Sequence, residues 1–135
     1  MKITIKKVNL WTEEVTRACG TWKTGTIEAD FRQITTLCGT PTFFRPNLDP
    51  EDEKTLCEWV VMLEADDEPG KIHVVTIYDW KTGDYPWNCR QWNTGGSAYG
   101  RALLAKVLIH IKECKPWSRG AEEPDGLTST LDLQI

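Results

Sequence analysis

Residues 93–101, NTGGSAYGR, have the composition of an anion-binding turn. Glycines before a helix expose backbone N–H groups, and the helix dipole favours a negative charge at that end. Arg101 would lie one turn into the helix and add positive charge. The glycine spacing matches a phosphate-binding P-loop, but Arg101 and Ala102 replace the Lys and the Ser or Thr that a nucleoside triphosphatase requires. The alternative is an ordinary strand-to-helix turn in which Gly95 or Gly96 has a positive φ.

A second group of aromatic and polar residues lies on a predicted β-hairpin. Trp and Tyr rings can stack a base, while Asp79 and Lys81 can bind its edge or a phosphate. Strand alternation places Tyr78 and Trp80 on one face and Asp79 on the other. Together with the glycine turn, this predicts a set of ligand-binding residues: Trp59, Tyr78, Asp79, Lys81, Trp92, Gly95, Gly96 and Arg101. The alternative is that the tryptophans fill the core and that the Asp79 carboxylate caps a turn.

Residues suited to metal binding or nucleophilic catalysis are sparse. The two histidines, His73 and His110, stand on different predicted elements, and no H-E-x-x-H, paired Asp cluster or G-x-S-x-G motif is present. Cys57 and His73 could meet across the hairpin. A buried, inert thiol is the expected state, because reactive cysteines need an electropositive, partly exposed site. We therefore predict a binding protein that is not an enzyme, with no catalytic residue, no metal and no cofactor.

Composition indicates a soluble globular protein. The chain has 135 residues, seven tryptophans and a formal net charge of -4, which argues against a basic nucleic-acid binder. Its five cysteines contain no C-x-x-C pair, so a disulfide framework or zinc knuckle is not expected. Free thiols of this kind indicate a reducing compartment. No apolar run approaches bilayer length and the N-terminal residues lack a signal-peptide core, so we expect a cytoplasmic protein without membrane contact.

The periodicity of apolar residues predicts the elements that must position these side chains. Alternation predicts strands over residues 1–10, 57–63, 71–80 and 89–93, and helical spacing predicts helices over residues 27–38 and 98–113. Residues 71–80 are apolar on both faces, which predicts a central strand. The lysines of residues 1–10 suit an edge strand. Residues 12–20 fit a short helix or a strand and turn.

These elements predict an α+β fold, with a small antiparallel sheet of about three to five strands packed by two main helices. Residues 1–114 are expected to form a single domain. Residues 115–135 begin with KPWSRGAEEPDG, which is typical of a flexible C-terminal arm. The alternation of LTSTLDLQI at its end is compatible with an added strand, in this sheet or in a partner's.

Four short motifs carry a resemblance to a known family. They are the helix end Leu37-Cys38-Gly39-Thr40-Pro41 after Phe31, the pair Glu58-Trp59 after Lys54, the strand end Thr76-Ile77-Tyr78-Asp79-Trp80-Lys81, and the turn Trp92-Asn93-Thr94-Gly95-Gly96. With these motifs the chain resembles a family of small bacteriophage accessory proteins of unsettled function. The resemblance spans residues 27–111, although Cys38 stands where a larger apolar residue is usual. It implies a phage origin and an accessory role, often against host defence.

Three functions follow as hypotheses, one of which is a hydrolase with an unrecognised site. The first is a phage-encoded binding protein that counters host defence by sequestering a nucleotide-derived immune signal in the cytoplasm of the infected bacterium. Such a protein needs stacking surfaces and anion donors, and a homo-oligomer is expected because small binding domains often form pockets at interfaces. The alternative is an anti-CRISPR-like inhibitor that binds a host defence protein through acidic residues 49–53, hairpin residues 66–68 and exposed tryptophans.

Overall fold

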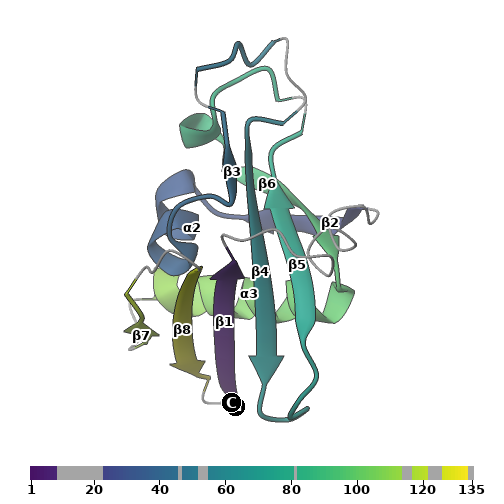
Figure 1. Ribbon diagram of the computed structural model, residues 1–135, viewed down its shortest axis with the longest axis vertical. Coiled ribbons are helices and arrows are strands. Elements are labelled where there is room, and N and C mark those ends of the chain that lie inside the picture. The colour runs from purple at the N-terminus through teal and green to yellow at the C-terminus, as the bar shows by residue number, and fades with distance from the viewer. Residues whose placement is uncertain are drawn as a thin grey trace.

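An antiparallel sheet dominates the computed structural model, which describes residues 1–8, 23–45, 47–51, 55–80, 82–113, 117–121 and 126–133. Seven strands follow one path of hydrogen-bonded neighbours, and an eighth pairs with β4 off this path (Figure 1). The path runs β2 (Lys23–Glu28), β6 (Gln91–Gly96), β5 (His73–Tyr78), β4 (Cys57–Ala65), β1 (Lys2–Val8), β8 (Gly126–Asp132) and β7 (Ser118–Arg119), and the strand off the path is β3 (Phe43–Phe44). Each of these pairings is antiparallel.

Two helices lie behind the sheet in the view of Figure 1. They are α2 (Phe31–Cys38) and α3 (Ala98–Lys112), and a short 3-10 turn, η1 (Pro86–Asn88), precedes β6. A capping box starts α2, since the Asp30 carboxylate accepts from Gln33 N–H at 2.7 Å and the Gln33 side chain accepts from Asp30 N–H at 2.9 Å. Ser97 caps α3 by accepting from Gly100 N–H at 3.0 Å.

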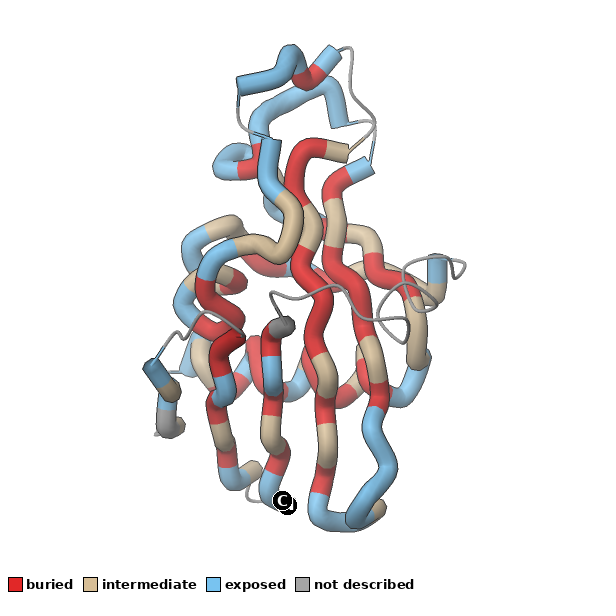
Figure 2. The backbone as a smooth tube through the Cα atoms, viewed as in Figure 1, coloured by how far each residue is buried: buried red, intermediate tan, exposed pale blue. Residues whose placement is uncertain are grey.

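The main core lies between the sheet and these helices. Figure 2 shows long buried stretches along β4 and β5. Trp59 and Trp92 are fully buried at its centre, with their rings edge to face at 5.2 Å between centroids. Around them pack aliphatic side chains from β1, β4, β5 and α3, including Ile3, Ile5, Leu63, Val75, Ile77, Leu104 and Val107.

The expectation of about three to five strands is wrong, because seven strands share one path and β3 adds to it. One added strand, β2, occupies residues 23–28, where the start of a helix at residue 27 was expected. Ile27 pairs with Trp92 across the β2–β6 ladder. The helix begins only at Phe31, because the capping box of Asp30 sets its first turn there.

Strand β1 is not an edge strand, contrary to the sequence-based expectation. It lies between β4 and β8, and its lysines do not all reach solvent. Lys7 shares the inward face of Ile3 and Ile5 and is fully buried, and its Nζ donates to Thr40 Oγ1 at 3.4 Å. The central position expected for the residues of β5 is confirmed, since β5 pairs with both β4 and β6.

The C-terminal residues contribute to this sheet. Strand β8 pairs with β1 from Lys2 opposite Asp132 to Val8 opposite Gly126, and it also pairs with β7. For residues 126–132 the structure therefore shows the added strand rather than a free arm. Residues 12–20, for which a short helix was one expectation, lie outside the described residues. No helix within the described ranges has the length and hydrophobicity needed to cross a membrane.

Candidate functional site

Two of the predicted ligand residues, Trp59 and Trp92, form part of the core. Both side chains are fully buried. Trp59 Nε1–H donates to the Gly39 carbonyl and Trp92 Nε1–H donates to the Ala29 carbonyl, each at 3.0 Å. Their polar atoms are thus satisfied inside the protein, as buried indole groups usually are. The core-filling interpretation is what the structure shows for these two tryptophans, and neither presents a face on which a ligand can stack.

The Asp79 carboxylate holds the start of β4. Its Oδ1 accepts from Leu56 N–H and Cys57 N–H, both at 3.0 Å, and the residue is only 3% exposed. Burial raises the pKa of Asp79, and the two backbone hydrogen bonds partly oppose this effect. The neighbouring Tyr78 is half-buried, and burial raises its pKa as well. Asp79 therefore caps a strand end, and Lys81, predicted beside it as a ligand residue, lies outside the described residues.

The glycine pair makes the turn from β6 into α3. Gly95 is opposite Thr76 in the β5–β6 ladder. Gly96 has φ 84°, and a Cβ at this residue would come within 2.2 Å of the Val74 carbonyl oxygen. The positive φ expected at one of the two glycines is thus confirmed. Arg101 lies one turn into α3 with its side chain against Gly25, where an added Cβ would be 2.6 Å from Arg101 Cδ.

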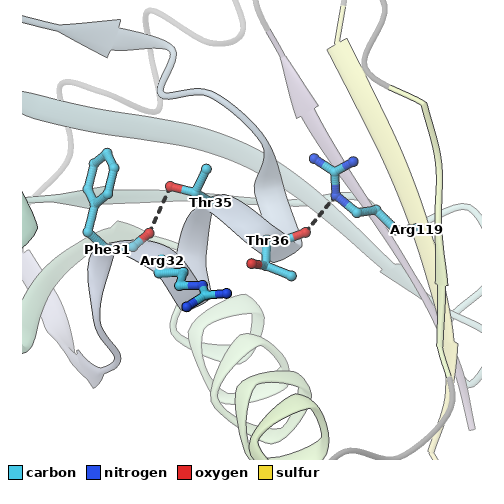
Figure 3. Close-up of a pocket in the computed structure, with 5 residues that line it drawn as sticks. All are labelled: Phe31, Arg32, Thr35, Thr36 and Arg119. Atoms are coloured by element: carbon cyan, nitrogen blue, oxygen red, sulfur yellow. Dashed lines mark hydrogen bonds between the residues drawn. The ribbon is translucent and has the colours of Figure 1, made fainter.

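None of the predicted ligand residues that the structure describes lines the groove along α2. This groove is open to solvent (Figure 3). It has a volume of about 490 Å³ and is lined by Phe31, Arg32, Thr35, Thr36 and Arg119. The first four residues come from α2 and Arg119 comes from β7.

Hydrogen bonds to the backbone of α2 order two of the groove side chains. Thr35 Oγ1–H donates to the Phe31 carbonyl at 2.7 Å, and Arg119 Nε–H donates to the Thr36 carbonyl at 2.8 Å (Figure 3). The second bond ties β7 to the C-terminal end of the helix, where unpaired carbonyls favour a cation. It uses only one of the nitrogens of Arg119, and the other two donate to no acceptor within the described ranges.

The charged side chains that line the groove among the described residues are two arginines, Arg32 and Arg119. Within the part of the chain that the structure describes, no carboxylate lines the groove and neither Arg32 nor Arg119 forms an ion pair. The ring of Phe31 lies at one end of the row, as Figure 3 shows, and is supported by Phe44 at 5.8 Å and Trp59 at 5.5 Å between centroids. Guanidinium groups bind phosphate or carboxylate through paired hydrogen bonds, and an aromatic ring offers a flat apolar contact. This arrangement can bind an anion that carries a flat group.

Sequence reasoning missed this groove. Arg32, Thr35 and Thr36 follow i, i+3 and i+4 spacing, so their common helix face was a signal that could have been read. No local signal connects them to Arg119, because β7 reaches α2 only through the long-range pairing of β8 with β1.

A second surface exposes large aromatic side chains beyond the strand ends. Trp80 is 47% exposed and Trp87 49% exposed. The rings of Tyr85 and Trp87 stack at 4.7 Å between centroids and 5° between planes. Figure 1 shows η1 and the neighbouring loops projecting at one end of the sheet. The described part of the acidic loop, including Asp49 and Glu51, is exposed as well.

The thiols and histidines do not form the pair considered from the sequence. The β4–β5 register places His73 opposite Leu63, at the far end of β4 from Cys57. Burial strongly raises the pKa of the Cys57 thiol, and Asp79 adds to the effect. Within the described ranges no cluster of His, Cys, Asp and Glu side chains could hold a metal ion.

Comparisons with protein families, curated proteins and solved structures found no match to this chain.

Proposed function

We propose that the protein binds a small nucleotide-like anion in the α2 groove and acts by sequestering it. In this proposal it is a phage-encoded, homo-oligomeric protein of the infected bacterial cytoplasm, and the ligand is a nucleotide-derived immune signal of the host. The observation that carries the proposal is the pair of arginines, Arg32 and Arg119, on a groove whose lining, among the described residues, contains no carboxylate.

Electrostatics supports an anionic ligand. A charge-assisted hydrogen bond from a guanidinium contributes about 1.5–3 kcal/mol, and a phosphate can engage two such groups at once. An acidic protein would repel the same anion elsewhere on its surface, since the formal net charge is -4. The groove is therefore where a phosphate would gain most.

The other lining residues support a nucleotide rather than a simple ion. Phe31 gives a flat apolar contact for a base, and the exposed Thr36 hydroxyl can bond to a base edge or a sugar. A volume of about 490 Å³ lies in the range of small-ligand sites. Sequestration asks nothing further of these residues, because it needs affinity and no chemical step.

The test is a thermal-shift screen of the protein against linear and cyclic nucleotides and ADP-ribose derivatives, followed by calorimetric titration of any compound that raises the melting temperature. Ligand at a hundredfold excess over Kd stabilises the native state by about 2.7 kcal/mol. Ligand recovered after denaturation of the protein is expected to be chemically unchanged.

The matched variants are Arg32→Gln and Lys106→Gln. Both remove one positive charge from an exposed helix position, but Lys106 lies on α3 and does not line the groove. We expect Arg32→Gln to weaken binding about ten- to a hundredfold and Lys106→Gln to leave it unchanged. Equal affinities of the two variants, or no stabilising compound in the panel, would refute the proposal.

A second candidate function is inhibition of a host defence protein through the exposed aromatic surface. The observation that favours it is the exposure of Trp80 and of the stacked pair Tyr85 and Trp87, because exposed aromatics are frequent hot spots of protein interfaces. Replacing Trp80 and Trp87 by alanine should then abolish the protection that the protein gives an infecting phage against host defence, whereas Arg32→Gln should not. The groove proposal predicts the reverse result.

A further inference from the structure

A serine, a histidine and a glutamate meet where the β4–β5 turn approaches the start of α3. Ser97 precedes α3, His73 begins β5 and Glu68 lies in the turn. We propose that these three residues form a nucleophilic site that hydrolyses small carboxylic esters. The proposal does not rest on the groove function, since the two sites share no residue.

The contacts have the order of a serine–base–acid relay. Ser97 Oγ is 2.7 Å from His73 Nδ1, and His73 Nε2 is 3.7 Å from Glu68 Oε1. His73 is only 7% exposed, and its Nε2 is buried with no hydrogen-bond partner among the residues that the structure describes. A histidine held between a hydroxyl and a carboxylate is the arrangement that activates a serine in acyl transfer.

The surrounding bonds orient the protons for this role. Ser97 Oγ accepts the N–H of Gly100 at 3.0 Å, which leaves its own hydrogen free to point at His73 Nδ1. The Glu68 carboxylate faces Nε2 and favours the tautomer that carries the proton on that nitrogen. His73 Nδ1 is then an acceptor and can act as a general base toward the hydroxyl.

The first turn of α3 provides donors for an oxyanion. The backbone N–H groups of Ala98 and Tyr99 donate to no acceptor among the described residues, as is usual for the first positions of a helix. They directly follow the serine. Donors in this position, at the positive end of a 15-residue helix, stabilise the negative charge that develops on a carbonyl oxygen.

Two packing features hold the three residues together. Gly100 lets α3 approach β5 closely, since an added Cβ would lie 2.7 Å from Val75 Cγ2 and 3.0 Å from His73 Cβ. The Tyr99 ring packs on the His73 ring at 4.8 Å between centroids, and its hydroxyl donates to Asp67 at 2.7 Å. The hydrogen bond from Tyr99 to Asp67 ties the turn that carries Glu68 to the helix that follows Ser97.

The proposed reaction needs no co-reactant other than water. Ser97 Oγ attacks the ester carbonyl carbon, and its proton passes to His73 Nδ1. The tetrahedral intermediate collapses with cleavage of the bond to the alkoxy oxygen, which leaves as the alcohol with that proton. Water then attacks the acyl-serine and gives its proton to His73 Nδ1. Release of the carboxylic acid returns this proton to Ser97 Oγ.

The test uses the full chain with a fluorophosphonate probe and with p-nitrophenyl acetate. We expect the probe to modify Ser97, located by mass spectrometry of peptides, and the ester to show a burst of acyl-enzyme followed by turnover. Ser97→Asn removes the nucleophile and keeps an N-cap acceptor, so the helix should persist while labelling falls below detection.

Three further variants separate catalysis from structure. His73→Gln should slow labelling at least about a hundredfold and Glu68→Gln at least about tenfold. The control Thr128→Val removes an exposed hydroxyl from β8 and should label like the wild type. Circular dichroism and urea unfolding establish that each variant is folded. Absence of labelling at Ser97 in the wild type, or equal labelling of folded His73→Gln, would overturn the proposal.

Discussion

Replacing Asp79 tests whether its carboxylate holds the start of β4. Asp79→Ala removes the acceptor of two buried N–H groups, those of Leu56 and Cys57, each at 3.0 Å. A buried donor left unpaired costs about 1–3 kcal/mol, so the two together should lower the free energy of unfolding by about 2–6 kcal/mol. That loss is a large part of the about 5–15 kcal/mol that stabilises a typical domain. Asp79→Asn keeps a side-chain oxygen and should cost less.

The two Asp79 variants also differ in their pH dependence. Burial is the largest influence on the Asp79 carboxyl and raises its pKa in the folded state. The folded protein therefore binds this proton more tightly than the unfolded chain. The contribution of Asp79 to stability is greatest below the unfolded pKa of about 3.9 and declines as the pH rises through the folded pKa. The amide of Asp79→Asn does not titrate, so wild-type stability relative to this variant should decline over the same interval.

Urea unfolding followed by tryptophan fluorescence, from about pH 3 to about pH 7.5, measures both effects. The slope of the free energy against urea concentration must stay constant, so that the midpoints report stability. Wild-type stability in Asp79→Ala would show that the backbone hydrogen bonds of Asp79 do not hold β4. A wild-type advantage over Asp79→Asn that grows with pH would contradict the raised pKa.

Three further substitutions or modifications test the core and the turn. Gly96→Ala forces a side chain onto a φ of 84° and toward the Val74 carbonyl, so urea unfolding should show a loss of more than about 1–3 kcal/mol; wild-type stability would contradict this backbone geometry. Burial raises the pKa of Cys38 to about 12, so iodoacetamide at neutral pH should alkylate this thiol only after denaturation. Peptide mass spectrometry measures the alkylation, and alkylation of the native protein would refute the burial of Cys38. Trp59→Phe leaves the Gly39 carbonyl without its indole donor and should lower the free energy of unfolding by at least about 1–3 kcal/mol, measured by urea unfolding. Wild-type stability of this variant would contradict the buried hydrogen bond of Trp59.

Local sequence patterns determined the type of the central elements. The strands expected at residues 57–63 and 71–80 correspond to β4, which runs two residues further, and to β5, and the helix expected at residues 98–113 is α3. These predictions succeed because apolar periodicity and capping are properties of neighbours along the chain. The start of α2 was misplaced because Ile27 fits a helical repeat as well as the inward face of β2. The capping pattern of Asp30 and Gln33 was the better signal.

The tertiary structure alone decided which elements are neighbours and hence where the sites lie. The residues of β1 and their neighbours in the sequence do not indicate that β8, from the other end of the chain, pairs with β1 and that Lys7 is buried. The same pairing places β7, with Arg119, beside α2 and creates the groove. Composition showed that tryptophan is frequent in this chain. It did not show which tryptophans are buried, because burial depends on the opposing layer of the fold. The sequence by itself thus determined the elements, and long-range strand pairing and close packing determined which side chains could act together.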